Sequence, residues 1–114
     1  MARADRLSRL DERRAQLEED YAAALIAALQ VTAAGKWGLF DHRQDRHDRK
    51  AAAPLVDELC EMGGEIDAMR AQLFMEPFAL HAEFDASRGP VAATAPGEPK
   101  QALAWLARLK PPTA

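Results

Sequence analysis

Two histidines in a polar stretch near the middle of the chain could bind a metal ion. His42 and His47 lie among acidic residues, and imidazole and carboxylate groups are the ligands of zinc and iron sites. The acidic residues of this stretch are Asp41, Asp45 and Asp48. The spacing of the histidines matches no common metal signature, and on a helix their rings would lie about 140° apart. Three arginines in the same stretch would repel a cation, so we expect a solvated polar loop with no metal and no other cofactor.

Nucleic acid is a second conceivable ligand of the same stretch, because Trp37 and Phe40 stand beside it. Residues 36–50 carry five basic and three acidic side chains, and binders of single strands combine such cations with rings that stack on bases. The whole chain has 15 basic and 18 acidic residues, and its net charge of -3 disfavours a nucleic-acid partner. In the competing interpretation, Trp37, Leu39 and Phe40 fold into the core as a plug.

Catalytic chemistry would have to come from isolated groups. Cys60 is the only thiol, and no phosphate-binding glycine loop or serine-nucleophile motif occurs. We expect Cys60 to be a buried, inert thiol and His81 to be packed or half-exposed. Glu58, Glu61 and Glu65 lack the histidines three residues further on that a di-iron bundle needs, so they indicate an acidic, solvated helix face.

The composition favours one domain in a reducing compartment. The 114 residues suffice for a single domain, 48% of them are apolar, and one cysteine cannot form an internal disulfide. The first residues contain no apolar segment of a signal peptide. The longest apolar run, Tyr21 to Leu29, is far shorter than the roughly 20 residues of a membrane span. We therefore expect a cytoplasmic protein that does not enter a membrane.

The first long element is predicted to be a helix over residues 5–34, a segment without proline or glycine and dense in good helix formers. One stripe of this helix is apolar, with spacings of three, four and seven. It consists of Leu7, Leu10, Leu17, Tyr21, Ala24, Ala28 and Val31. Arg14 occupies the one polar position of the stripe. Gly35 follows the last apolar turn, where a left-handed residue commonly ends a helix.

A second long helix is predicted over residues 54–75. Its apolar side chains alternate at spacings of four and three, the pattern of a coiled-coil seam. They are Leu55, Leu59, Met62, Ile66, Met69 and Leu73. Pro54 suits the first turn of a helix, and Pro77 favours an end before it. Gly63 and Gly64 do not shift the pattern, so we expect one continuous helix with a close neighbour there, either the first helix or Trp37. The alternative is two shorter helices that meet at the glycines.

The remaining segments are predicted to be shorter elements. Residues 35–50 form a connecting loop, and residues 76–98 are irregular with a short helix, because prolines and glycines cluster towards their end. A last helix is predicted over residues 99–109, with Trp105 beside its apolar face. That face consists of Ala102, Leu103, Leu106 and Leu109.

Together these elements predict an all-α fold, in which the two long helices form an antiparallel hairpin and a short C-terminal helix joins them. The first helix has more apolar surface than one neighbour covers, so a second copy of the chain could complete a dimeric helical bundle. A compact monomer is the alternative. The expected core or dimer seam consists of Leu17, Tyr21, Leu25, Leu29, Leu55, Leu59, Met62, Ile66, Met69 and Leu73.

Two short stretches carry a resemblance to other proteins. Residues 34–40 read Ala-Gly-Lys-Trp-Gly-Leu-Phe, and residues 97–100 read Gly-Glu-Pro-Lys before the last helix. The chain resembles small bacterial helical proteins of uncharacterised function, which carry a similar Gly-basic-aromatic-Gly-Leu-Phe stretch between helices. The resemblance implies no activity and transfers no catalytic residue. It implies only that the segment from Trp37 to Phe40 has a purpose.

The sequence thus favours an interaction protein, a homodimer that binds an unidentified protein partner through its loop or its acidic face. The alternative is a small enzyme or ligand-binding domain with a pocket between the loop and the paired glycines, in which a histidine acts as acid or base. The candidate residues are Trp37, Phe40, His42, His47, Gly63 and Gly64.

Overall fold

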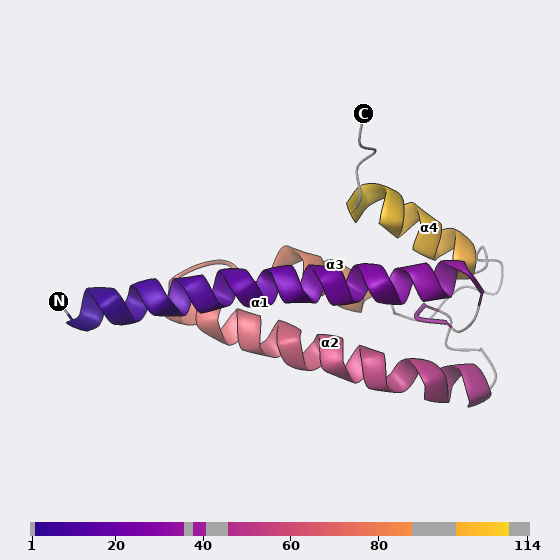
Figure 1. Cartoon of the computed structure of the whole chain (residues 1–114), viewed down its shortest axis with the longest axis horizontal. Coiled ribbons are helices and arrows are strands. Elements are labelled where there is room, and N and C mark those ends of the chain that lie inside the picture. The colour runs from indigo at the N-terminus through magenta and orange to yellow at the C-terminus, as the bar shows by residue number, and fades with distance from the viewer. Residues whose placement is uncertain (1, 36–37, 41–45, 88–97, 110–114) are drawn as a thin grey trace.

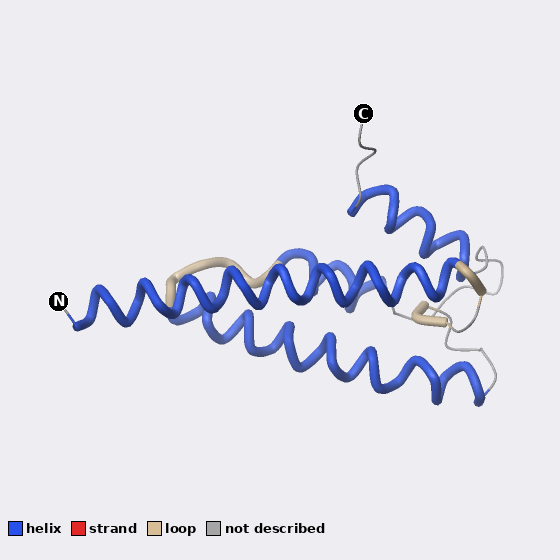
Figure 2. Tube along the Cα trace, viewed as in Figure 1, coloured by secondary structure: helices blue, strands red, loops and turns tan. Residues whose placement is uncertain are grey.

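The computed structural model describes residues 2–35, 38–40, 46–87 and 98–109 (Figure 1). Within them the chain forms four helices and no strand, as Figure 2 shows. These are α1 (Ala2–Ala33), α2 (Arg46–Gln72), α3 (Ala79–Ser87) and α4 (Glu98–Leu109). The prediction of an all-helical chain is confirmed for these residues. No helix among them is both long enough and apolar enough to cross a lipid bilayer.

α1 is the rod on which the other helices are arranged. α2 runs back along it in the opposite direction, and α4 packs against the C-terminal part of α1 (Figure 1). α3 contacts α2, and a hydrogen bond between His81 and Tyr21 links it to α1. The molecule is elongated, with principal-axis extents of 56 × 36 × 21 Å.

α1 buries a face only in its middle and C-terminal parts. Tyr21, Leu25 and Leu29 are fully buried there, whereas residues 4–9 are all exposed. The helix ends as the position of Gly35 predicts. The φ of this glycine is 77°, and its N–H donates to the carbonyl of Thr32 at 2.9 Å.

α2 begins at Arg46, eight residues before its predicted start, and this corrects two expectations. Residues 46–50 are helical rather than part of a loop, and Pro54 lies inside the helix rather than in its first turn. A proline removes one helical hydrogen bond but has a helical φ. The burial of Ala52 and Val56 on either side of Pro54 offsets that loss.

α2 ends at Gln72, three residues earlier than predicted, in a tight turn. The N–H of Met75 donates to the carbonyl of Arg70 at 2.8 Å, and the N–H of Phe74 to that of Ala71 at 3.2 Å. These bonds form a Schellman motif, whose C′ residue adopts the left-handed conformation. That residue is Phe74, with a φ of 59°, so the turn and not Pro77 ends the helix.

Aromatic side chains fill the core beneath α4. Phe40 and Phe84 are fully buried, and the ring centroids of these two residues and Trp105 lie 6.0 to 6.3 Å apart. The predicted face of the last helix is wrong in one respect, because Leu103 is 57% exposed and Trp105 is buried. Ala102 is fully buried and therefore defines the buried face of α4. On a helix, Trp105 lies three positions further on and shares that face, whereas Leu103, the next residue, does not.

The predicted seam lies inside a single chain. Its buried members are Tyr21, Leu25, Leu29, Leu59, Ile66 and Met69, and its partly buried members are Leu17, Leu55, Met62 and Leu73. The apolar surface that we assigned to a second copy is therefore covered by α2 and α4 of the same chain. The six buried members are therefore not free to form the interface of a dimer of this fold.

Candidate functional site

The predicted site residues of the loop fall largely outside the part of the chain that the structure describes. Trp37 and His42 lie outside the described residues, as does the side chain of His47, whose backbone belongs to α2. Phe40 is fully buried, and Leu39 is 2% exposed, so these two residues act as a plug in the core. No group of three metal-ligating side chains occurs in the part of the chain that the structure describes.

The close neighbour at Gly63 is His81 of α3, a residue that the sequence did not suggest. Trp37, one of the two predicted neighbours, lies outside the described residues. A Cβ atom built on Gly63 would overlap the imidazole ring of His81, whereas one built on Gly64 meets nothing within 4 Å. Gly63 is therefore needed for a tight contact between α2 and α3. Phe40, one member of the expected pocket, packs against Phe84 and Trp105. The other loop members of that pocket, Trp37, His42 and the side chain of His47, lie outside the described residues.

The ring of His81 is held between Gly63 and Tyr21. The Tyr21 hydroxyl and His81 Nδ1 lie 2.8 Å apart, and the two rings meet edge to face. Burial raises the pKa of Tyr21, with smaller contributions from Cys60, Asp85 and Asp67. The hydroxyl therefore stays protonated at neutral pH and can donate to Nδ1 when that nitrogen carries no proton. The pair joins α1 to α3, and a fully buried phenol is poorly placed to react with a substrate.

A second polar cluster joins α1 to α2. The guanidinium of Arg70 donates to both carboxylate oxygens of Glu18, at 2.8 and 3.1 Å, and Arg14 donates to the same carboxylate at 2.7 Å. Arg70 also donates to the carbonyl of Glu76 at 2.9 Å and lies over the ring of Phe78. Burial alone would raise the pKa of Glu18, but the hydrogen bonds from Arg70 and Arg14 outweigh it and lower the pKa.

This cluster explains the polar interruption of the apolar stripe. Arg14 is the polar exception that the sequence predicted, but its partners were not predicted. Glu18 lies four residues further along the same helix, a spacing that allows an ion pair and was a usable signal. The contact between Glu18 and Arg70 spans 52 residues and has no local signature.

Three exposed apolar side chains lie towards the end of the rod opposite α4. We call residues 2–13 the arm and residues 73–77 the elbow. The arm extends past the other helices in Figure 1, and the elbow lies at its base, because Arg70 binds Glu18. Leu7 of the arm is 42% exposed, and at the elbow Phe74 is 98% and Met75 36% exposed.

The outward position of Phe74 is strained. A residue with a Cβ in the left-handed conformation costs about 1 kcal/mol or more, which is why glycine is usual at this position of a Schellman motif. The ring is almost fully exposed, so contacts within the chain do not compensate that cost. Strain of this kind often marks a functional position.

Phe74→Gly is expected to raise the free energy of unfolding by about 1 kcal/mol, because glycine adopts the left-handed conformation without strain. Phe74→Ala serves as the matched control. It removes the exposed ring but keeps the strain, so it should change stability by less than about 0.5 kcal/mol. Urea denaturation followed by circular dichroism, at a low protein concentration, measures both changes. Equal stabilities of the two variants would show that the turn is unstrained.

The acidic face of α2 is confirmed, since Glu58, Glu61 and Glu65 are all exposed. The expectation of a buried thiol is wrong, because Cys60 is exposed. Leu59 is 1% exposed and defines the buried face of α2, and the following residue is turned about 100° away from it, towards the acidic side.

The comparisons with known proteins add nothing to this geometry. No protein-family model, no curated protein and no solved structure matches the chain. Both polar clusters described above connect one helix to another. The features that a partner could reach are the apolar side chains of the arm and the elbow and the acidic face of α2.

Proposed function

We propose that this chain is a helical interaction protein without enzymatic activity, which self-associates and binds a protein partner. One observation carries the proposal: three large apolar side chains, Leu7, Phe74 and Met75, are exposed at the same end of the rod, one of them in a strained conformation. Exposed apolar surface of this kind is where a partner protein can bind. A cytoplasmic location, suggested by the single cysteine, belongs to the same proposal.

Self-association predicts a native mass of twice the 12.5 kDa of the chain. Size-exclusion chromatography with light scattering measures this mass over a dilution series from about 100 to 1 μM, a range suited to weak and moderate dimers. We expect the dimer mass at the high end and a decline on dilution. A mass of 12.5 kDa at every concentration would rule out self-association.

The proposed protein partner would bind the acidic part of the surface. Residues 53–87 contain eight acidic residues and one arginine, so a partner with basic residues at its contact surface fits them best. A pull-down from cell lysate with the full chain as bait tests this half of the proposal. Recovery of the chain alone would count against a separate partner and leave self-association intact.

A further inference from the structure

The arm carries the apolar stripe of α1 beyond its buried part, and there Leu7 is 42% exposed and Leu10 is partly exposed. Leu7 and Leu10 continue the line of Leu17, which packs against the core, and of Tyr21, whose ring contacts Phe78 and His81. The stripe thus extends an established helix–helix interface beyond the end of α2. A helix that lies in line with α2 would cover the stripe of the arm in the same way as α2 covers the stripe further along α1.

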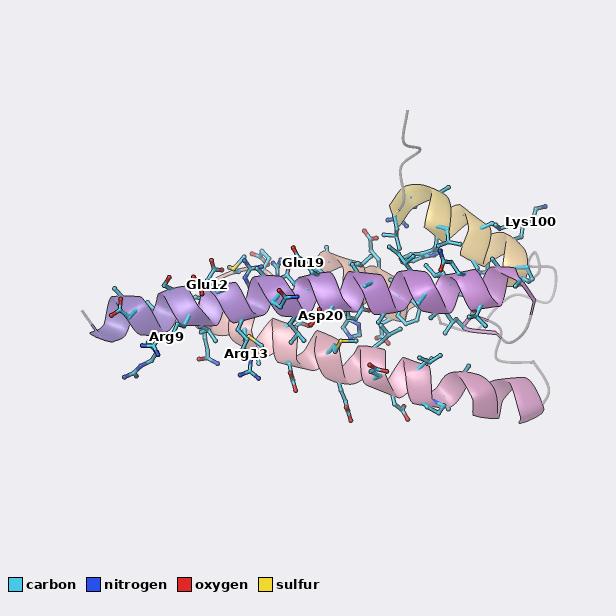
Figure 3. All side chains as sticks on the ribbon, in the orientation of Figure 1. Arg9, Glu12, Arg13, Glu19, Asp20 and Lys100 are labelled. Carbon is cyan, nitrogen blue, oxygen red and sulfur yellow. The ribbon has the colours of Figure 1, made fainter. Side chains whose placement is uncertain are left out.

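Basic residues flank this stripe on one side. Arg6, Arg9 and Arg13 are exposed, and Figure 3 shows Arg9 and Arg13 pointing to the side of α1 along which α2 runs. Glu12 and Glu19 point to the opposite side (Figure 3). The helix that covers the arm should therefore carry acidic residues that can pair with these arginines. Beside them it should carry small side chains, against which Leu7 and Leu10 can pack.

The outer face of α2 has both properties. Glu58, Glu61 and Glu65 are exposed along it, and none of them forms an ion pair within the described residues. Next to them the face bears small side chains, among them Gly64 and Ala68, and the space above Gly64 is open. A neighbouring helix can approach such a face closely, since no bulky group stands between the backbones.

The arrangement of the helices allows both contacts in one dimer. α1 and α2 are antiparallel, and the arm extends past the elbow (Figure 1). A two-fold axis near the elbow would therefore lay each arm along the outer face of α2 in the other copy. The two elbows would meet at the axis, and the exposed ring of Phe74 would be buried there.

We propose that the arm of one copy binds the outer face of α2 in a second copy, and that the two copies exchange arms in this way across a two-fold axis. The inference rests on the proposed self-association and specifies its surface. Continuity with the interface of α1 and α2 and the match of arginines with glutamates both support a second copy as the occupant. Each α2 then lies between its own α1 and the partner's arm.

Charge reversal tests this reciprocal contact. R9E/R13E makes the arm acidic, and E61R/E65R makes the outer face of α2 basic. Each variant alone should elute as a monomer, with at least a tenfold higher dissociation constant than the wild type, because like charges face each other at both contacts. Mixed in equal amounts, the two variants should restore the dimer mass, because an acidic arm then meets a basic face and a basic arm an acidic one.

A matched control reverses two acids on the other side of α1. E12R/E19R changes the net charge as much as E61R/E65R does and should remain a dimer. Circular dichroism of all variants checks that they are folded. If the wild type is a dimer and both reversed variants remain dimers, or if mixing them does not restore the dimer, the proposed surface is wrong. A wild type that is monomeric at all concentrations would instead overturn the self-association on which the inference rests.

Discussion

Gly63→Ala is expected to destabilise the protein by about 2 kcal/mol, whereas Gly64→Ala is expected to stabilise it by about 1 kcal/mol. Both glycines lie inside α2, where alanine is the better helix former. Only Gly63 faces the ring of His81, which a Cβ would overlap. The ring would have to move, and the buried hydroxyl of Tyr21 would lose its hydrogen bond, which costs about 1–3 kcal/mol.

Urea denaturation of both variants measures this difference, and a double-mutant cycle identifies its cause. In a His81→Ala background the ring is absent, so Gly63→Ala should no longer destabilise and should resemble Gly64→Ala. The contact would be refuted if Gly63→Ala cost as much without the ring as with it.

Arg70→Met is expected to destabilise the protein by about 2 kcal/mol. The Arg70 side chain of α2 donates hydrogen bonds to Glu18 of α1 and to the elbow. Hydrogen bonds to charged groups contribute about 1.5–3 kcal/mol. The side chains of Arg70 and Glu18 are only 17% and 16% exposed, so solvent screens their interaction weakly. Arg70→Lys keeps the charge but loses the two-pronged geometry, and its effect should be intermediate.

The ion pair of Arg108 and Glu83 provides the matched control. Its side chains are 57% and 50% exposed, and pairs of this kind contribute little. Arg108→Met should therefore cost less than about 1 kcal/mol, even though Arg108 also lies over the ring of Trp105. Equal costs at the two sites would contradict the role assigned to Arg70.

The effect of Arg70→Met should depend on pH. The folded-state pKa of Glu18 is lowered below its ordinary value of 4.5, so the charged carboxylate stabilises the fold above that pH. This stabilisation is lost as the pH falls through the folded-state pKa. The difference in stability between the wild type and Arg70→Met should thus be full near neutral pH and shrink below 4.5, which denaturation at several pH values would measure.

Features that depend on neighbouring residues could be predicted from the sequence. The helical character of both long segments follows from the spacing of their apolar residues, and the left-handed Gly35 follows from its place after the last apolar turn. The exposed glutamates of α2 follow from their spacing on one helix face. The continuity of α2 through Gly63 and Gly64 was also predicted, because the pattern keeps its phase across them.

Features that depend on distant residues could not be predicted. Gly63 contacts His81, and Glu18 binds Arg70. No local sequence pattern indicates either contact. The assignment of Leu103 to the buried face failed because leucine and tryptophan are both apolar, and only the aromatic cluster with Phe40 selects Trp105.

The sequence by itself therefore determined that the two long segments are helical and that one face of α2 is acidic, because both follow from the spacing of residues within a few turns. The tertiary structure decided which apolar faces are covered within one chain. It assigned Tyr21, Leu25 and Leu29 to the core and left the arm and Phe74 exposed. Burial depends on which helices meet and where each one ends, and these are properties of the whole chain.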